Sequence, residues 1–298
     1  GKEDSRSLEQ WQTVMADLRH WLGPVPVVFT GGEALLKPLT IDLVSYASAL
    51  GLFVELLTHG FWDEQTMIGK LALARPARIT ISLDGLGETH NKIRGRDNFF
   101  EKTQKSINTL TRMRKDHGLN FSIRLKTVIM DHNLDNVCDV ARFAESIDAE
   151  VFYQPIEQNY NTPEDPQWFT HSDTWPRDTL AVVATVERLR QLKLQGLPIA
   201  NSFAQLNAMI PYFRNPESLR LATQSHSAHE QQLLCAALTT LQIQSNGDVK
   251  VCMAKEPVGN IQSQPIRRIW ETRPHWWESG CCLEQRLSET EKHAAAAS

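Results

Sequence analysis

Val25-Pro-Val-Val-Phe-Thr-Gly-Gly-Glu33 is a short apolar run that ends in two glycines and a carboxylate. Such a run predicts a buried strand of a parallel sheet whose carboxyl end opens into a site. Ligands of α/β proteins bind beyond the carboxyl ends of the strands. Gly31, Gly32 and Glu33 are therefore expected to meet a small molecule, because glycine lets the backbone approach closely and a carboxylate suits an ammonium group. The alternative is a structural strand-to-helix turn with a surface glutamate.

Around this stretch, apolar runs of strand length alternate with segments of helical periodicity. The predicted helices span residues 8–22, 38–50, 63–73, 98–117 and 134–146, and the predicted strands span residues 53–58, 78–83, 121–130 and 150–154. Alternation of this regularity predicts right-handed βαβ units and a parallel sheet.

The pattern changes after residue 157. A polar, proline-bearing loop precedes a clear helix at residues 178–194 and a weaker one at residues 203–213. Asn246-Gly247 lies between two short apolar runs and predicts a β-hairpin, which a short helix at residues 265–272 follows. We expect three regions: residues 1–157 as the α/β domain, 158–230 as a helical connection and 231–298 as a small C-terminal extension.

Composition narrows the function classes. The chain has 298 residues and a formal net charge of -4, so a nucleic acid or an anionic membrane surface is not an expected partner. We find no apolar run of membrane-spanning length and no signal peptide, so a soluble, cytoplasmic protein is the expectation. The length suffices for one barrel-sized domain and a smaller appendage.

Four of the five cysteines lie in the last quarter of the chain: Cys235, Cys252, Cys281 and Cys282. In a cytoplasmic protein such a group favours a metal site over disulfides. Thiolates suit an iron-sulfur cluster, and zinc with four sulfurs is also compatible. The alternative is that these cysteines pack as small hydrophobes, which is the preferred interpretation for Cys138 in its amphipathic helix.

Several motifs at successive strand ends resemble those of radical S-adenosylmethionine (SAM) enzymes. They are Phe29-Thr-Gly-Gly-Glu33, Leu57-Thr-His-Gly60, Ile81-Ser-Leu-Asp-Gly85 and His90-Asn-Lys-Ile-Arg-Gly95. The tail, with Cys235, the Asn-Gly hairpin, Cys252 and the last two cysteines, resembles a SPASM or twitch extension that carries auxiliary iron-sulfur clusters. The resemblance implies a partial (β/α)6 TIM-like barrel that lacks its first strand, followed by a cysteine-bearing hairpin and helix.

The same resemblance implies roles for individual residues. Gly31, Gly32 and Glu33 would hold the amino group of the SAM methionine. Ser82 would bind the ribose or the carboxylate of SAM, and Arg94 would bind the carboxylate. The alternatives are a capping serine at position 82 and a solvated arginine at position 94. His59 replaces the asparagine expected in that family turn.

One departure concerns the 4Fe-4S cluster that cleaves SAM. The family binds this cluster through a Cys-x3-Cys-x2-Cys motif after the first barrel strand, but no cysteine precedes Cys138 in this sequence. Truncation beyond the motif would explain the missing cysteines and the missing strand together. The alternative is a degenerate relative that has lost the cluster.

The resemblance implies an enzyme that, when intact, reductively cleaves SAM to methionine and a 5'-deoxyadenosyl radical, which abstracts hydrogen from a substrate. The expected substrate is a peptide or protein, or else a small molecule such as a tetrapyrrole, and flavodoxin or ferredoxin is the expected electron donor. One rival is a non-catalytic scaffold or metal-binding protein. Another is a conventional TIM-barrel enzyme that uses Glu33 and a histidine as acid and base.

Overall fold

The computed structural model describes residues 7–159, 162, 165, 167–216, 239–251 and 256–274. The chain divides into two compact units, and each is described by itself. The larger unit is Pro24–Ser218, and the smaller unit joins Gly1–Gly23 to Leu219–Ser298.

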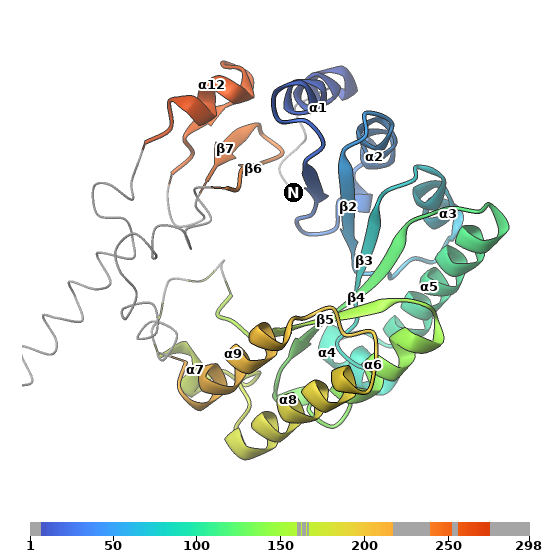
Figure 1. Cartoon of the computed structure of the whole chain (residues 1–298), viewed down its shortest axis with the longest axis vertical. Helices are drawn as coiled ribbons and strands as arrows, with labels where there is room; N and C mark the ends of the chain where they lie inside the picture. The colour runs from blue at the N-terminus through green and yellow to red at the C-terminus, as the bar shows by residue number, and fades with distance from the viewer. Residues whose placement is uncertain are drawn as a thin grey trace, which may run out of the picture. The chain divides into compact units, whose positions relative to one another are not determined.

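A five-stranded parallel sheet forms the centre of the larger unit (Figure 1). Its strands are β1 (Pro26–Phe29), β2 (Phe53–Thr58), β3 (Arg78–Ser82), β4 (Ser122–Ile129) and β5 (Glu150–Pro155). They lie in chain order, and every neighbouring pair is parallel. This confirms the predicted α/β class and strand alternation. The carboxyl ends of all five strands therefore share one edge of the sheet.

Helices connect these strands and lie along one side of the sheet (Figure 1). They are α2 (Thr40–Ala49), α3 (Thr66–Leu73), α4 (Glu88–Arg94), α5 (Phe99–Asp116) and α6 (Val137–Ser146), with short 3-10 turns at Ala34–Leu36 and Asp131–Asn133. Sequence analysis did not predict α4. Its seven residues include two buried polar side chains, and a glycine caps each end, so it has no apolar stripe to detect.

The two faces of the sheet differ sharply in chemistry. Residues such as Ile79, Ile81 and Leu125 alternate with polar neighbours and are fully buried on the helix side. The opposite face, here called the polar face, carries Glu55, Arg78, Thr80, Ser82, Arg124, Lys126, Glu150 and Phe152 at alternate positions of β2 to β5. Successive side chains of a strand point to opposite faces, so these residues share one surface.

Ion pairs confirm that the polar face is one connected surface. Arg78 lies 3.5 Å from Glu55 on β2 and 3.3 Å from Glu150 on β5. Arg124 lies 2.7 Å from the same Glu150 carboxylate. These contacts reach from β2 to β5 near the amino ends of the strands, so they leave the carboxyl edge to other residues.

The chain after β5 adds a short sixth position to the sheet. Its described part contains the helices α7 (Trp168–His171), α8 (Thr179–Leu194) and α9 (Phe203–Arg214), and α8 and α9 lie where helices were predicted. Between α8 and α9, Ile199 forms a parallel bridge with Val151 of β5. The amide of the fully buried Asn201 also pairs with both backbone groups of Tyr153.

The smaller unit brings the start of the chain together with its C-terminal part. It contains α1 (Leu8–Leu22), the antiparallel strands β6 (Gln242–Ile243), β7 (Asp248–Lys250) and β8 (Gly259–Asn260), and α12 (Ile266–Glu271). The predicted hairpin is confirmed, with Gly247 in the positive-φ conformation that its turn requires (φ 85°).

One small core joins α1 to the C-terminal elements. Val14 and Leu18 of α1 pack with Val249, Ile266 and Ile269, and the rings of Trp21 and Trp270 meet edge to face at 6.5 Å. The compact units thus place α1 with the C-terminal extension, whereas the expected first region was residues 1–157. In the described part of the chain, no helix has the length and apolarity to cross a bilayer.

Candidate functional site

Glu33 lies four residues after the end of β1, and its carboxylate is held by the turn that follows it and by the end of β2. One oxygen accepts a hydrogen bond from the backbone N–H of Leu35 at 3.1 Å. The other accepts from the Thr58 hydroxyl at 3.1 Å and from the backbone N–H of His59 at 2.7 Å, both at the end of β2. The side chain is only 4% exposed. Glu33 is therefore a fixed negative charge at the carboxyl edge rather than a solvated surface residue.

His59 supports this carboxylate with its ring as well as its backbone. Its Nδ1 accepts the backbone N–H of Phe61 at 2.9 Å, which leaves the proton on Nε2, 3.4 Å from the Glu33 oxygen. Burial lowers the pKa of His59, and nearby Arg94 and Arg96 lower it further, while Glu33 opposes the shift. The imidazole is therefore neutral at pH 7, with its Nε2–H close to the Glu33 carboxylate.

Helix α5 fixes the turn that presents His59. The hydroxyls of Thr103 and Ser106 donate to the carbonyls of His59 and Gly60. Gly60 has a φ of 74°, and a Cβ at this position would come within 2.9 Å of the Thr103 side chain. Only glycine fits this turn without displacing α5.

Phe99, the first residue of α5, connects the Glu33 side of the site to the Arg94 side. Its ring centroid lies 5.9 Å from that of His59 and 5.2 Å from that of His90. The Arg94 guanidinium lies 5.9 Å from the same centroid. Glu33 and Arg94, which follow β1 and β3 in the chain, thus belong to one cluster of contacts.

Arg94, the last residue of α4, forms an ion pair that sequence analysis missed. Its Nη2 lies 2.7 Å from the Asp84 carboxylate, whose side chain is 5% exposed while that of Arg94 is 29% exposed. The Arg94 Nε is buried and has no hydrogen-bond partner in the described part of the chain. Arg94 is therefore positioned by Asp84 and keeps an unused donor.

Every polar atom of Asp84 takes part in an ion pair or a hydrogen bond. Its second carboxylate oxygen accepts the backbone N–H of Val128, and its own N–H donates to Nδ1 of His90. Its carbonyl accepts the Asn133 amide, which also caps the end of β4. An aspartate directly after a buried strand was a usable sequence signal, but its pairing with a residue ten positions later was not visible without the fold.

Lowering the pH from 7 to 5 is expected to destabilise the larger unit through His90 by about 2 kcal/mol. Burial, followed by Arg94, lowers the pKa of this fully buried ring from 6.5 to about 3. Below pH 6.5 His90 binds a proton in the unfolded chain but not in the folded chain, so the free energy of unfolding falls as the pH falls. Urea denaturation at several pH values measures this slope.

A matched pair of variants assigns the slope to His90. His90→Gln keeps an acceptor for the Asp84 N–H and removes the titrating group, so the pH dependence between 7 and 5 should flatten. His117→Gln, at an exposed position, should leave it unchanged. An undiminished slope in the His90 variant would contradict the assignment.

The remaining predicted ligand-binding residues lie at the same edge. Ser82 ends β3, is half-buried and lies on the polar face. Gly31 and Gly32 have φ values of 95° and 44°, and a Cβ at either position would meet no atom within 4 Å. The backbone there is open to close approach by a ligand.

The tail cysteines of the predicted metal site, Cys235, Cys252, Cys281 and Cys282, lie outside the described residues. Cys138 lies in α6 and is buried, and burial raises the pKa of its thiol, in keeping with the packing role expected for it. Tyr153 does not lie on the polar face. Its hydroxyl donates to the Val137 carbonyl on the helix side of the sheet, because alternation along β5 turns its neighbours Phe152 and Gln154 to the polar face instead.

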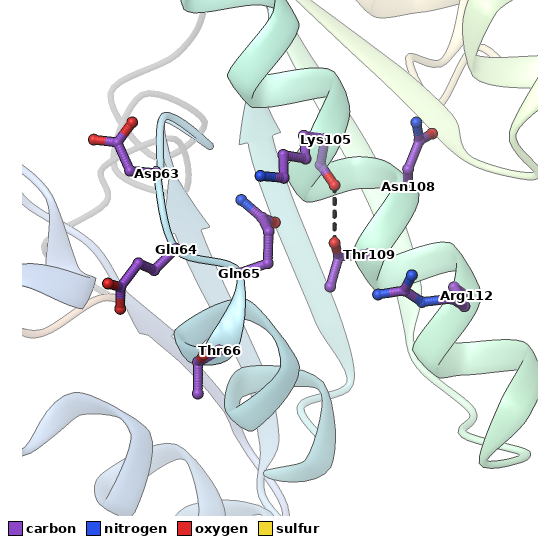
Figure 2. A pocket seen from close by; sticks show the side chains of 8 residues that line it. All are labelled: Asp63, Glu64, Gln65, Thr66, Lys105, Asn108, Thr109 and Arg112. Atoms are coloured by element: carbon purple, nitrogen blue, oxygen red, sulfur yellow. Dashed lines mark hydrogen bonds between the residues drawn. The ribbon is translucent and has the colours of Figure 1, made fainter.

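Two surface pockets of the larger unit lie apart from these residues. One, of about 480 Å³, lies between the start of α3 and the outer face of α5 (Figure 2). It sets the acids Asp63 and Glu64 against the bases Lys105 and Arg112, so its charges compensate one another. The other, of about 760 Å³, lies between α6 and α8 and includes Cys138. Neither contains a predicted site residue.

Comparison with protein families matches two parts of the chain. Residues 1–144 match the family described as "Radical SAM superfamily". Residues 235–288 match the SPASM family, described as "Iron-sulfur cluster-binding domain", and this range includes all four tail cysteines.

Individual relatives agree with these matches. The chain is 24% identical over 266 residues to the AdoMet-dependent heme synthase of Methanosarcina barkeri, covering 84% of this chain and 69% of that protein. It is 30% identical over 146 residues to the sporulation killing factor maturation protein SkfB of Bacillus subtilis, covering 49% of this chain but only 34% of that protein.

The fold is similar to that of Streptococcus suis SuiB. The SAM-bound structure of SuiB gives a TM-score of 0.64 at 14% identity and covers 95% of this chain and 65% of SuiB. SuiB bound to its precursor peptide SuiA gives a TM-score of 0.65 at 14% identity, covering 92% of this chain and 60% of SuiB. At this identity the likeness shows the fold alone.

Proposed function

Because the chain belongs to the radical SAM superfamily and carries a SPASM-type iron-sulfur region, we propose that the protein binds SAM at the carboxyl ends of β1 to β3. The observation that carries this proposal is the single cluster that joins a fixed carboxylate, Glu33, to a guanidinium with an unused donor, Arg94. The methionine part of SAM carries an ammonium and a carboxylate, so it needs one partner of each sign.

The residues of the site fit SAM in chemistry. Glu33 accepts the ammonium group, since each carboxylate oxygen has two acceptor positions and the Leu35 N–H uses one of those on Oε1. Arg94 and the Ser82 hydroxyl donate to the carboxylate or the ribose. His59 keeps Glu33 in place through its backbone N–H, which donates to the carboxylate. When bound, SAM supplies the adenosyl group through which hydrogen is removed from a substrate.

The cluster that cleaves SAM has no ligand set in this sequence, because no cysteine precedes Cys138. No step of the reaction is therefore assigned through that cluster. The tail offers thiolates for a separate, auxiliary iron-sulfur cluster at Cys235, Cys252, Cys281 and Cys282, with zinc as the competing occupant. Iron, zinc and acid-labile sulfide content of anaerobically purified protein, compared with that of Cys235→Ser, separates the two.

Anaerobic equilibrium dialysis measures the affinity of the protein for SAM and tests the proposal directly. Gly32→Ala places a methyl group in the open space beside Glu33 and is expected to weaken SAM binding at least roughly tenfold, the equivalent of about 1.4 kcal/mol. Gly118→Ala is the matched control, because this glycine also has a positive φ (57°) and open space but lies between α5 and β4 at the opposite edge.

Equal SAM affinity in the two glycine variants would contradict SAM binding at Glu33. Both substitutions strain a left-handed backbone by roughly 1–2 kcal/mol, so their effects on stability should match. A loss of SAM affinity in Gly32→Ala alone therefore reports on the ligand rather than on folding.

A peptide is the substrate class that we propose. SuiB is solved with a precursor peptide, and SkfB is named for maturation of a killing factor. The heme synthase of Methanosarcina barkeri supports a tetrapyrrole as the second candidate. We also propose a reducing, cytoplasmic setting with a flavodoxin or ferredoxin as electron donor, since thiolate-bound iron-sulfur clusters need reduced cysteines.

A further inference from the structure

His59 closes its own turn with a hydrogen bond to its ring. Nδ1 of the ring accepts the backbone N–H of Phe61, two residues further along the chain, at 2.9 Å. An asparagine side chain makes the same bond in an Asx turn, so the geometry of the turn does not require histidine. What histidine adds is a second ring nitrogen and the ability to take up a proton near neutral pH.

The second nitrogen, Nε2, faces the Glu33 carboxylate and lies 3.4 Å from Oε2. That oxygen already accepts the Thr58 hydroxyl and the His59 backbone N–H, which fill the two acceptor positions of a carboxylate oxygen. The Nε2–H of the neutral ring therefore finds no open acceptor position on this oxygen. Protonation turns the contact into an ion pair, because attraction between opposite charges needs no free lone pair.

The His59 ring is sheltered but still in contact with solvent. The ring centroids of Trp62 and Phe99 lie 5.2 and 5.9 Å from its own and shield part of its surface. The side chain remains 30% exposed, so water reaches it. A proton can therefore exchange at His59 in the folded protein, whereas the His90 ring is fully buried.

Two basic side chains approach the ring through Phe61. Arg96 and Lys102 lie 4.7 and 4.2 Å from the centroid of the Phe61 ring, which meets the His59 ring edge to face at 6.4 Å. Lys102 is compensated by an ion pair with Asp63, but the described residues give Arg96 no ion pair. Positive charge on this side disfavours a further proton on the His59 ring.

Glu33 acts in the opposite direction and favours a charged ring. Burial lowers the pKa of His59 most, Glu33 raises it, and Arg94 and Arg96 lower it. Arg94 is itself paired with Asp84, which offsets part of its charge. Any cation that neutralises Glu33 therefore makes the protonated form of His59 less favourable.

We propose that protonation of His59 opposes SAM binding, because the imidazolium and the ammonium group of SAM compete for the single negative charge of Glu33. This inference rests on the proposed function, which takes Glu33 as the partner of that ammonium group. The open acceptor position is on Oε1, and Nε2 of His59 lies beside Oε2, so both cations would lie against one carboxylate. The neutral ring leaves the charge of Glu33 to SAM. The coupling is reciprocal, so bound SAM lowers the pKa of His59.

Anaerobic equilibrium dialysis at pH 7 and pH 5 measures this competition as a ratio of two SAM dissociation constants. The dissociation constant of the wild-type protein is expected to be at least roughly threefold higher at pH 5, since the protonated fraction binds SAM poorly. His59→Asn keeps an acceptor for the Phe61 N–H and removes the titrating ring, so its ratio should be close to one. His117→Gln, at an exposed position, should keep the wild-type ratio. The same ratio in wild type and His59→Asn would overturn the inference.

NMR of the wild-type protein with isotope-labelled histidine follows the ring directly, and contacts with the Trp62 ring identify its signal. Saturating SAM is expected to lower the pKa of His59, and Glu33→Gln should lower it in the free protein, because each removes uncompensated negative charge. An unchanged pKa in the SAM-bound wild type would overturn the inference, and this result does not depend on the folding of a variant.

The two proposals fail in different ways. Absence of SAM binding at pH 7 would overturn the proposed function and this inference with it. SAM binding with the same affinity at pH 7 and pH 5 would overturn this inference alone and leave SAM at Glu33.

Discussion

Replacing Glu33 by alanine is expected to lower the stability of the larger unit by about 3 kcal/mol and to abolish measurable SAM binding. The carboxylate accepts hydrogen bonds from the Leu35 and His59 backbones and from the Thr58 hydroxyl, and it is almost fully buried. Hydrogen bonds to a charged group contribute roughly 1.5–3 kcal/mol each, and the abandoned N–H groups carry a desolvation cost. Thermal unfolding should show a fall in Tm on the order of 10 °C.

One further variant separates the charge of Glu33 from its shape, and a second serves as a surface control. Glu33→Gln keeps the size but turns an amide N–H toward one set of donors, so it should recover part of the lost stability and none of the SAM affinity. Glu145→Ala, at an exposed position of α6, should change stability by no more than about 0.5 kcal/mol. A Glu33→Ala protein as stable as wild type would show that the carboxylate does not hold the ends of β1 and β2 together.

Replacing Asp84 by asparagine is expected to cost roughly 3–5 kcal/mol, because it leaves Arg94 without its counter-charge in a largely buried position. The value should fall at the lower end, since Arg94 is 29% exposed. The amide oxygen of the introduced side chain can still accept the Val128 N–H, so the loss reports on the ion pair. Urea denaturation at pH 7 measures it as a lower midpoint with an unchanged slope.

The control for Asp84 is the surface pair of Asp139 and Arg142 in α6. Both partners are 48% exposed, and such pairs contribute at most about 1 kcal/mol. Asp139→Asn should therefore have little effect on the urea midpoint. Similar losses in the two variants would show that burial does not distinguish the Asp84 pair from an ordinary surface pair.

Local signals predicted the elements of the fold. Apolar runs at strand length, glycine turns after them and the Asn246-Gly247 turn are each properties of a few adjacent residues, and the structure has the strands and the hairpin where these signals lie. The edge of the sheet that carries Glu33 and Ser82 followed from the same reasoning, because parallel strands share one carboxyl edge.

Partners across the fold were not predictable in the same way. The pairing of Asp84 with Arg94 and the support of Glu33 by His59 depend on how α4, α5 and β2 meet, which no short stretch of sequence encodes. The face on which Tyr153 lies could not be predicted either, because alternation along β5 had no fixed phase until contacts with α6 set it. The seven residues of α4 lacked the apolar periodicity that reveals longer helices.

The packing of α1 against β7 and α12 has a consequence for biosynthesis. During translation α1 is synthesised long before β7 and α12. The apolar side chains of α1 therefore stay without their packing partners until these C-terminal elements have been made. Pro24–Ser218 emerges in the meantime as one continuous segment, and domains generally fold as units while the chain is still growing. Helix α1, which precedes this segment in the chain, is thus covered only after the segment has been synthesised.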